Sequence, residues 1–183
     1  MRRPLKELVI TVAGHHGSGR STNAKLLADC LGLNYISTGI LFRERADELG
    51  ISLEEMNKIA GEDSNFDNYL DERTKSESRK RGVVIDANLS AWMADDPDIR
   101  IFVTCPFEER VKRIALREGR ENTEVEKETK AREDSERKRY LEYYAIDIND
   151  LSIYDVVLNT SLFTIAENSR ILKCIIDEYV TGE

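Results

Sequence analysis

The chain has 183 residues, of which 40% are hydrophobic and 34% are charged, and its formal net charge is −8. This composition is typical of a globular protein with one sizeable core, and it argues against disordered or collagen-like structure. The acidic balance argues against a protein that coats nucleic acid, although a few arginines could still hold a small anionic ligand.

The three cysteines, Cys30, Cys105 and Cys174, are far apart and form no CxxC pair. We therefore expect neither a disulfide framework nor a structural metal. The longest apolar runs have the length of a strand, and no signal-peptide pattern precedes the first glycine. We expect a cytoplasmic protein without a membrane partner.

In chain order, β-branched or apolar runs alternate with segments of helical periodicity. The predicted strands are residues 8–13, 35–36, 83–86, 99–104 and 153–158. The predicted helices are residues 20–31, 40–49, 53–60, 63–80, 107–118 and 121–139, with a closing helix around 171–179.

This alternation predicts an α/β fold: a doubly wound, parallel five-stranded sheet of the P-loop NTPase type, with helices on both faces. We expect a single domain over residues 1–183 with two polar helical inserts, at about 38–81 and 119–148. The second insert carries few large apolar groups, so we expect it to be mobile and exposed to solvent.

The segment from Gly14 to Ser21 follows a predicted strand and opens a helix, as the phosphate-binding pattern GxxxxGK[ST] requires. Its glycines let successive N–H groups point inward, and the helix N-terminus adds partial positive charge. The predicted ATP-binding residues are Gly14, Gly17, Ser18, Gly19, Arg20, Ser21 and Thr22. Ser21 is placed to bind the Mg²⁺ that accompanies the phosphates.

Arg20 stands where the pattern has lysine. Arginine keeps the positive charge but is longer, planar and forked, so it either reaches the phosphates differently or points away. His15 and His16 occupy variable positions of the loop, where we expect the side chains to face solvent.

Several further motifs occur in a characteristic order. They are Tyr35-Ile36-Ser37-Thr38-Gly39 with Phe42-Arg43, Leu89-Ser90-Ala91-Trp92-Met93, Arg132 with Arg137-Lys138-Arg139-Tyr140, and residues 146–150 with Ser152-Ile153-Tyr154-Asp155 and Asn159-Thr160. Together with the glycine loop, they resemble the archaeal type of cytidylate kinase, within the nucleoside monophosphate kinases. The resemblance implies a CORE, an acceptor-binding insert and a LID that closes over ATP, with Mg²⁺ as the metal.

The resemblance also implies roles for individual residues. Arg43 would grip the acceptor phosphate, with Arg73 as a helper, and Ser37, Thr38 and Gly39 would line the acceptor site. Arg132, Arg137 and Arg139 match LID arginines that reach the transferring phosphoryl group.

Helical geometry separates the three LID arginines. Arg132 and Arg139 are seven residues apart and share a helical face, whereas Arg137 is rotated off it. All three converge only if the helix breaks near Ser135. The alternative is an ordinary solvated charged helix.

Asp86 ends the third strand, at the carboxyl edge of the sheet where doubly wound proteins bind ligands. It could hold a Mg²⁺-bound water or position the acceptor; the alternative is a strand-end cap. Close by, the chain departs from the family pattern. Asn88 replaces an acceptor-site arginine, Ala87 and Ala91 replace two glycines, and Thr74 replaces a glutamine. Losing one charge-assisted phosphate contact, worth about 1.5–3 kcal/mol, is enough to change the preferred acceptor.

The first functional hypothesis is an ATP-dependent kinase that transfers the γ-phosphoryl group of Mg-ATP to a phosphorylated small molecule, CMP or dCMP. A second keeps this chemistry but uses a phosphorylated alcohol such as mevalonate 3-phosphate. A third is a nucleotide-binding regulator that has lost transfer. The residues leave the acceptor open, and they allow either a monomer or a homodimer.

Overall fold

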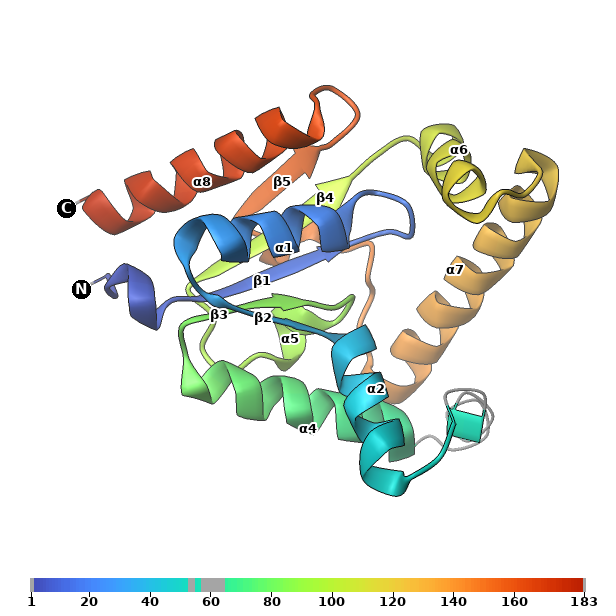
Figure 1. The fold of residues 1–183 in the computed structure, drawn as a ribbon, viewed down its shortest axis with the longest axis horizontal. Coiled ribbons are helices and arrows are strands. Elements are labelled where there is room, and N and C mark those ends of the chain that lie inside the picture. Colours follow the sequence, from blue (N-terminus) through green and yellow to red (C-terminus); the bar gives the residue numbers. More distant parts are fainter. Residues whose placement is uncertain (1, 53–54, 57–64, 183) are drawn as a thin grey trace.

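The computed structural model describes residues 2–52, 55–56 and 65–182. Its strands form one parallel five-stranded sheet in the order β2-β3-β1-β4-β5 (Figure 1), which confirms the predicted fold class. The strands are β1 (Val9–Gly14), β2 (Asn34–Ser37), β3 (Val83–Asp86), β4 (Ile99–Thr104) and β5 (Val156–Asn159).

The register of the sheet decides which residues meet at its carboxyl edge. Val12 of β1 lies beside Asp86 of β3, and Gly14 lies beside Val103 of β4. The glycine loop therefore leaves the central strand directly next to the carboxylate that ends β3. Ligands bind at this edge in doubly wound sheets.

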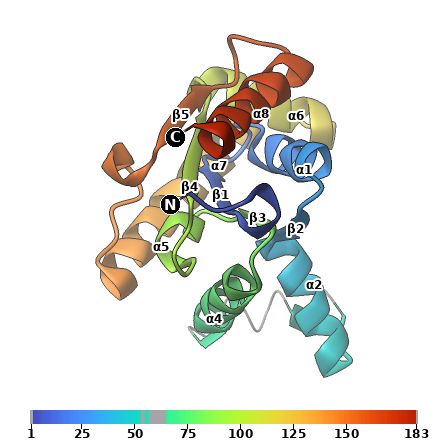
Figure 2. The ribbon, with the colours of Figure 1, turned by 90° about the vertical axis from the view of Figure 1, so that its left-hand side faces the viewer.

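Helices cover both faces of the sheet (Figure 2). The helices are α1 (Arg20–Leu31), α2 (Thr38–Leu49), α4 (Asn65–Lys80), α5 (Ser90–Met93), α6 (Phe107–Glu118), α7 (Asn122–Tyr144) and α8 (Ile165–Thr181). Side chains alternate along β1, so Ile10 and Val12 pack under α1 and α8, while Ala13 packs against Ala91 of α5 on the opposite face.

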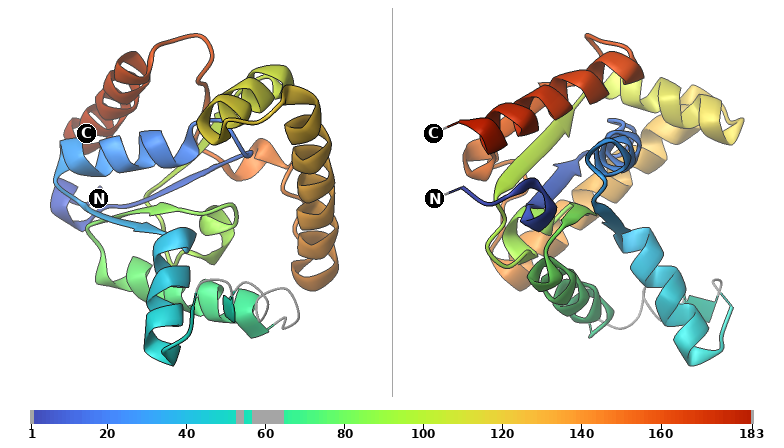
Figure 3. Two further views of the ribbon diagram at one scale, coloured as in Figure 1. Left: turned by 45° about the vertical axis from the view of Figure 1, so that its right-hand side comes forward. Right: turned by 60° about the vertical axis from the view of Figure 1, so that its left-hand side comes forward.

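Helix α7 contributes little to the hydrophobic core. Of its 23 residues, only Val125, Thr129 and Tyr140 are buried, and Val125 packs against α6. The helix runs along the side of the molecule at the carboxyl edge of the sheet, and α2 and α4 lie below that edge (Figure 3). These helices occupy the two predicted inserts. No helix in the described part of the chain is both long and apolar enough to span a bilayer.

The structure corrects several predicted boundaries. Strand β5 begins at Val156 because Leu151–Ile153 form a 3-10 turn instead of the start of a strand. The short helix α5 is too brief to show helical periodicity in the sequence. Helix α7 continues to Tyr144, five residues beyond its predicted end. Most of the predicted helix at 53–60 falls outside the described residues.

Candidate functional site

The glycine loop joins β1 to α1 and is shaped by positive φ angles. Gly17 has φ 78° and Gly19 has φ 85°, values that favour glycine. A side chain at position 17 would lie 2.7 Å from the carbonyl oxygen of Arg110. Gly19 caps α1 without a side-chain hydrogen bond, so it leaves the N–H groups of the first turn open. This arrangement fits an anion such as the phosphates of a nucleotide.

The hydroxyl-bearing residues of the loop divide by exposure. Ser18 is buried, whereas Ser21 and Thr22 are exposed on the first turn of α1. Ser21 is thus accessible to a metal ion at the phosphates. Within the described ranges, no group of three or more His, Cys, Asp or Glu side chains is arranged to hold a metal.

Two residues, to which no role was assigned from the sequence, hold the loop in place. Arg110 is buried, and its Nη1 donates to the carbonyl oxygen of His16 at 2.9 Å. Thr160 donates to the carbonyl oxygen of Ser18 at 2.6 Å. Arg110 also pairs with Glu133 of α7 at 2.5 Å. The only sequence signal for Arg110 was a charged residue on the inward face of α6, next to Val111.

Arg20 extends from the start of α1 to the carboxyl end of β3. Its Nε donates to Oδ1 of Asp86 at 2.5 Å, and its Nη1 donates to the carbonyl oxygen of Gly14 at 3.3 Å. Nη1 also donates to Oδ1 of Asn88. Arg20 is therefore held by β3 and the residues that follow it.

Asp86 is almost fully buried, and both of its carboxylate oxygens have partners. Besides Arg20 at Oδ1, the hydroxyl of Tyr35 donates to Oδ2 at 2.7 Å. Burial, together with the charge of Asp86, raises the pKa of Tyr35 to about 12, so Tyr35 stays a hydrogen-bond donor at neutral pH. Both oxygens of Asp86 are thus hydrogen-bonded to side chains of the protein. The role of Asp86 in magnesium binding stays a prediction.

Glu136 of α7 connects three parts of the site. It accepts hydrogen bonds from His16 Nε2 at 2.8 Å, from Arg132 Nε at 3.1 Å and from Asn88 Nδ2 at 3.3 Å. Burial opposes its ionisation, but His16 and Arg132 outweigh that effect and hold the pKa of Glu136 below its ordinary value. Contrary to expectation, His16 is bonded to α7 and does not simply face solvent. Sequence patterns alone gave no reason to single out Glu136.

A cavity of about 540 Å³ begins at these residues. Its walls come from the glycine loop, α2, α4, the segment after β3, and α7. The lining residues are His16, Arg20, Thr38, Gly39, Phe42, Leu70, Asp71, Thr74, Ala87, Asn88, Leu89, Met93, Arg132, Ser135, Glu136, Arg139, Tyr140 and Tyr144.

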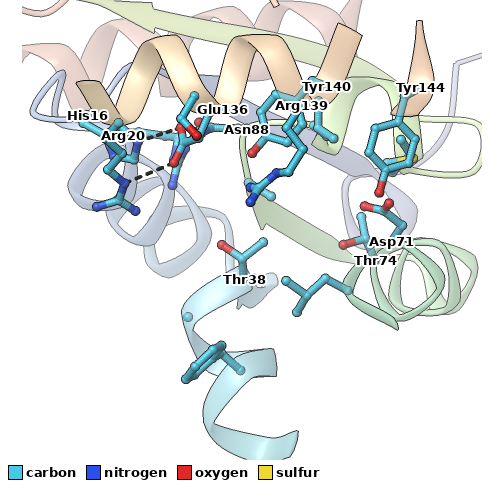
Figure 4. A pocket seen from close by; sticks show the side chains of 18 residues that line it. His16, Arg20, Thr38, Asp71, Thr74, Asn88, Glu136, Arg139, Tyr140 and Tyr144 are labelled. Atoms are coloured by element: carbon cyan, nitrogen blue, oxygen red, sulfur yellow. Dashed lines mark hydrogen bonds and ion pairs between the residues drawn. The ribbon is translucent and has the colours of Figure 1, made fainter. Parts of the chain in front are cut away.

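The two ends of the cavity differ in chemistry (Figure 4). The end next to the glycine loop holds Arg20, Asn88 and Glu136. At the opposite end, the Asp71 carboxylate of α4 faces the Tyr144 hydroxyl of α7. Sequence patterns gave no reason to single out Asp71, because it is one of many charged residues on the polar helix α4.

The structure separates the predicted arginines into two groups. Arg20, Arg132 and Arg139 line the cavity, whereas Arg43, Arg73 and Arg137 do not. Arg137 is exposed because α7 continues without a break at Ser135, the condition on which convergence of the three LID arginines depended.

Among the predicted acceptor residues, Thr38, Gly39 and Asn88 line the cavity. Ser37 does not line it, because its hydroxyl caps α2 by accepting from the N–H of Ile40 at 3.2 Å. Arg43 is exposed on α2 but approaches the cavity mouth, since its Nη1 lies 3.7 Å from the Cβ position of Gly39.

Several solved structures have a fold similar to that of this chain. A shikimate kinase from Bacteroides thetaiotaomicron superposes with a TM-score of 0.63 at 15% identity, covering 93% of this chain and 98% of that one. A shikimate kinase from Acinetobacter baumannii gives a TM-score of 0.62 at 15% identity, covering 95% and 96%. At such identities the likeness concerns the fold alone.

Sequence comparison is more specific. Residues 9–162 match the model of the cytidylate kinase-like family. A cytidylate kinase of Desulfurococcus amylolyticus is 45% identical over 174 residues, covering 92% of this chain and 92% of that protein. A cytidylate kinase of Staphylothermus marinus is 40% identical over 174 residues, covering 94% and 98%. Because these matches span the glycine loop and every wall of the cavity, the chain belongs to the cytidylate kinase-like family and is a phosphotransferase of the nucleoside monophosphate kinase type.

Proposed function

We propose that the protein transfers the γ-phosphoryl group of ATP to CMP or dCMP. The observation that carries this proposal is the cavity that starts at the glycine loop and continues between α2, α4 and α7. A donor bound at the loop and an acceptor bound in the cavity would meet at Arg20 and Glu136. Relatives named cytidylate kinases, which match this chain over nearly their whole length, support the choice of acceptor.

The donor side binds by means of the backbone. The N–H groups of the loop and of the first turn of α1 hold the phosphates, and Ser21 supplies a hydroxyl for Mg²⁺. When bound, Mg²⁺ neutralises charge on the phosphoryl group in transfer. The helix N-terminus fits this role because its N-cap residue, Gly19, makes no side-chain hydrogen bond to the first turn.

The residues at the far end of the cavity favour binding of a cytosine base rather than a uracil base. A carboxylate accepts a hydrogen bond from the exocyclic amine of cytosine, whereas uracil presents a carbonyl oxygen at that position. Asp71 lies at this end, beside Thr74. Asp71 would therefore favour CMP and repel UMP.

The two inserts would then act as the acceptor-binding region and the LID. Helices α2 and α4 form the floor of the cavity, and α7 forms its opposite wall. Arg132 and Arg139 of α7 line the cavity, and in this proposal their charges act on the phosphoryl group during transfer. Positioned arginine charge and the exclusion of water supply most of the rate in such transfers.

The test is an ADP-release assay with Mg-ATP and a panel of acceptors: CMP, dCMP, UMP, AMP and phosphomevalonates. We expect CMP or dCMP to give the highest kcat/KM. Preferred turnover of a phosphomevalonate would contradict the proposal and favour the phosphorylated-alcohol kinase. Tight ATP binding without turnover of any acceptor would indicate a nucleotide-binding regulator.

A further inference from the structure

The residue after the last glycine of a phosphate loop is ordinarily a lysine that reaches the β- and γ-phosphates. In this protein that residue is Arg20, and its guanidinium is fixed at the end of β3. Asp86 accepts from Nε at 2.5 Å, and Asn88 accepts from Nη1. The side chain is only 17% exposed, so its position is set by the protein.

The same guanidinium lines the cavity at the end next to the glycine loop, and Thr38 and Asn88 line the same cavity. The two arginines that we expected to hold the acceptor phosphate do not line the cavity. Arg73 pairs with Glu44 at 2.9 Å and with Glu77 at 3.7 Å. Arg43 is exposed on α2 and comes near the cavity only beside Gly39. Arg20 is therefore the cavity arginine that comes from the phosphate loop, while Arg132 and Arg139 come from α7.

We propose that Arg20 binds the phosphate of the acceptor instead of the β- and γ-phosphates of ATP, with Asp86 and Asn88 as the positioning residues that aim it. This inference rests on the proposed function only in requiring an acceptor that carries a phosphate. Among the described residues, Nη2 of Arg20 has no hydrogen-bond partner, and it is the donor that we assign to the acceptor phosphate. A charge-assisted bond from guanidinium to phosphate is among the stronger hydrogen bonds in proteins.

The chemistry of Asn88 fits this arrangement. Its carbonyl oxygen accepts from Arg20, and its amide nitrogen donates to Glu136 at 3.3 Å. An arginine at position 88 could not accept from Arg20 and would place two positive groups side by side. The neutral amide therefore joins the cation of the loop to the anion of α7.

The experiment measures the two substrates separately by calorimetry: CMP without ATP, and Mg-ATP without CMP. The variants are Arg20→Gln, Arg20→Lys and Asn88→Ala, with Lys25→Gln on the exposed side of α1 as the control. We expect Arg20→Gln to weaken CMP binding about tenfold, as for the loss of one charge-assisted bond. Mg-ATP affinity should change less than about threefold, because the backbone cradle stays intact. Arg20→Lys and Asn88→Ala should weaken CMP binding by smaller factors, and the control should weaken neither.

A loss of Mg-ATP affinity equal to or larger than the loss of CMP affinity would overturn the inference, as would unchanged CMP binding. If Arg20→Gln fails to fold because Asp86 loses its partner, Arg20→Lys and Asn88→Ala decide the question. If the wild type prefers another phosphorylated acceptor, the proposed function fails, and the same measurements with that acceptor still test Arg20. An acceptor without a phosphate would refute the assignment.

Discussion

The donor cradle and the acceptor cavity are built in different ways. The proposed cradle consists of consecutive residues, 14–21, and would bind ATP through backbone groups whose directions follow from the glycine positions. The cavity collects side chains from the loop, α2, α4, the segment after β3, and α7. A site made of one local segment can be identified from sequence, whereas a site made of distant side chains depends on how the helices pack.

The two regions also differ in how firmly they are held. Every residue of β1, the strand that leads into the glycine loop, is buried. Arg110 and Thr160 also donate hydrogen bonds to backbone carbonyl oxygens of the loop. Helix α7 is instead fixed largely by polar contacts, such as Glu133 with Arg110 and Glu136 with His16. Few buried apolar contacts give a segment low local stability, so we expect α7 to move more easily than the cradle.

The largest effect should come from blocking the cradle. Gly17→Ala would place a Cβ 2.7 Å from a backbone oxygen at a positive φ, so the loop must shift. We expect Mg-ATP affinity to fall by at least about 100-fold, measured by calorimetry, as several backbone bonds to phosphate are lost. The control is Gly50→Ala, which has φ 65° and no atom within 4 Å of the new Cβ. It should cost only about 1 kcal/mol of stability and leave ATP binding unchanged. Equal effects of the two variants would contradict a backbone-built cradle.

A matched pair on α7 tests which side chains the cavity uses. Arg139 lines the cavity, whereas Arg137 is exposed two residues away. Arg139→Ala should lower kcat by about 100-fold with little effect on Mg-ATP affinity, because its charge acts on the phosphoryl group in transfer. Arg137→Ala should lower kcat by less than about threefold. A larger fall in kcat for Arg137→Ala than for Arg139→Ala would mean that α7 rotates or breaks during turnover.

Glu136→Gln tests the contact between α7 and the loop. The variant keeps the shape of the side chain but removes the charge that holds Arg132 and His16. We expect kcat to fall about tenfold, since Arg132 loses its orientation, and Mg-ATP affinity to stay the same or rise because a negative charge near the phosphates disappears. Glu142→Gln, on an exposed part of the same helix, is the control. Unchanged turnover in Glu136→Gln would show that the contact is incidental.

The smallest effect concerns stability and pH. Burial of His15, which Glu133 only partly offsets, lowers the pKa of His15 from its ordinary 6.5. As the pH falls through 6.5, His15 is therefore protonated in the unfolded chain before it is protonated in the folded protein. The free energy of unfolding decreases with falling pH until the pH reaches the pKa of His15 in the folded protein. The stabilising contribution is fully present above pH 6.5. Glu136 acts in a separate window, because its pKa lies below 4.5.

We expect Tm to fall between pH 7.5 and 5.5, and we expect His15→Gln to flatten this slope. The measurement is thermal unfolding by circular dichroism at intervals across that range. An identical slope in the variant and the wild type would assign the pH dependence to other groups.

The confirmed predictions depended on local patterns. Apolar runs, helical periodicity and glycine spacing predicted the sheet, the order of strands and helices, and a glycine loop between β1 and α1. The start of β5 was wrong because Ile153 and Tyr154 have the side chains of a strand, yet the first lies in a 3-10 turn and the second follows it directly. Turn formation there depends on Asp150, whose side chain accepts from the N–H of Ser152.

By itself, the sequence determined the glycine loop and its place between a strand and a helix, because that pattern is local and the donor site that we propose there uses backbone atoms. Only the tertiary structure decided the shape and lining of the cavity in which we propose that the acceptor binds. Residue types cannot reveal that Arg20 turns toward β3, that Arg43 and Arg73 lie outside the cavity, or that Glu136 reaches His16. Those outcomes depend on the directions of long side chains and on the placement of α7, which helical periodicity leaves free.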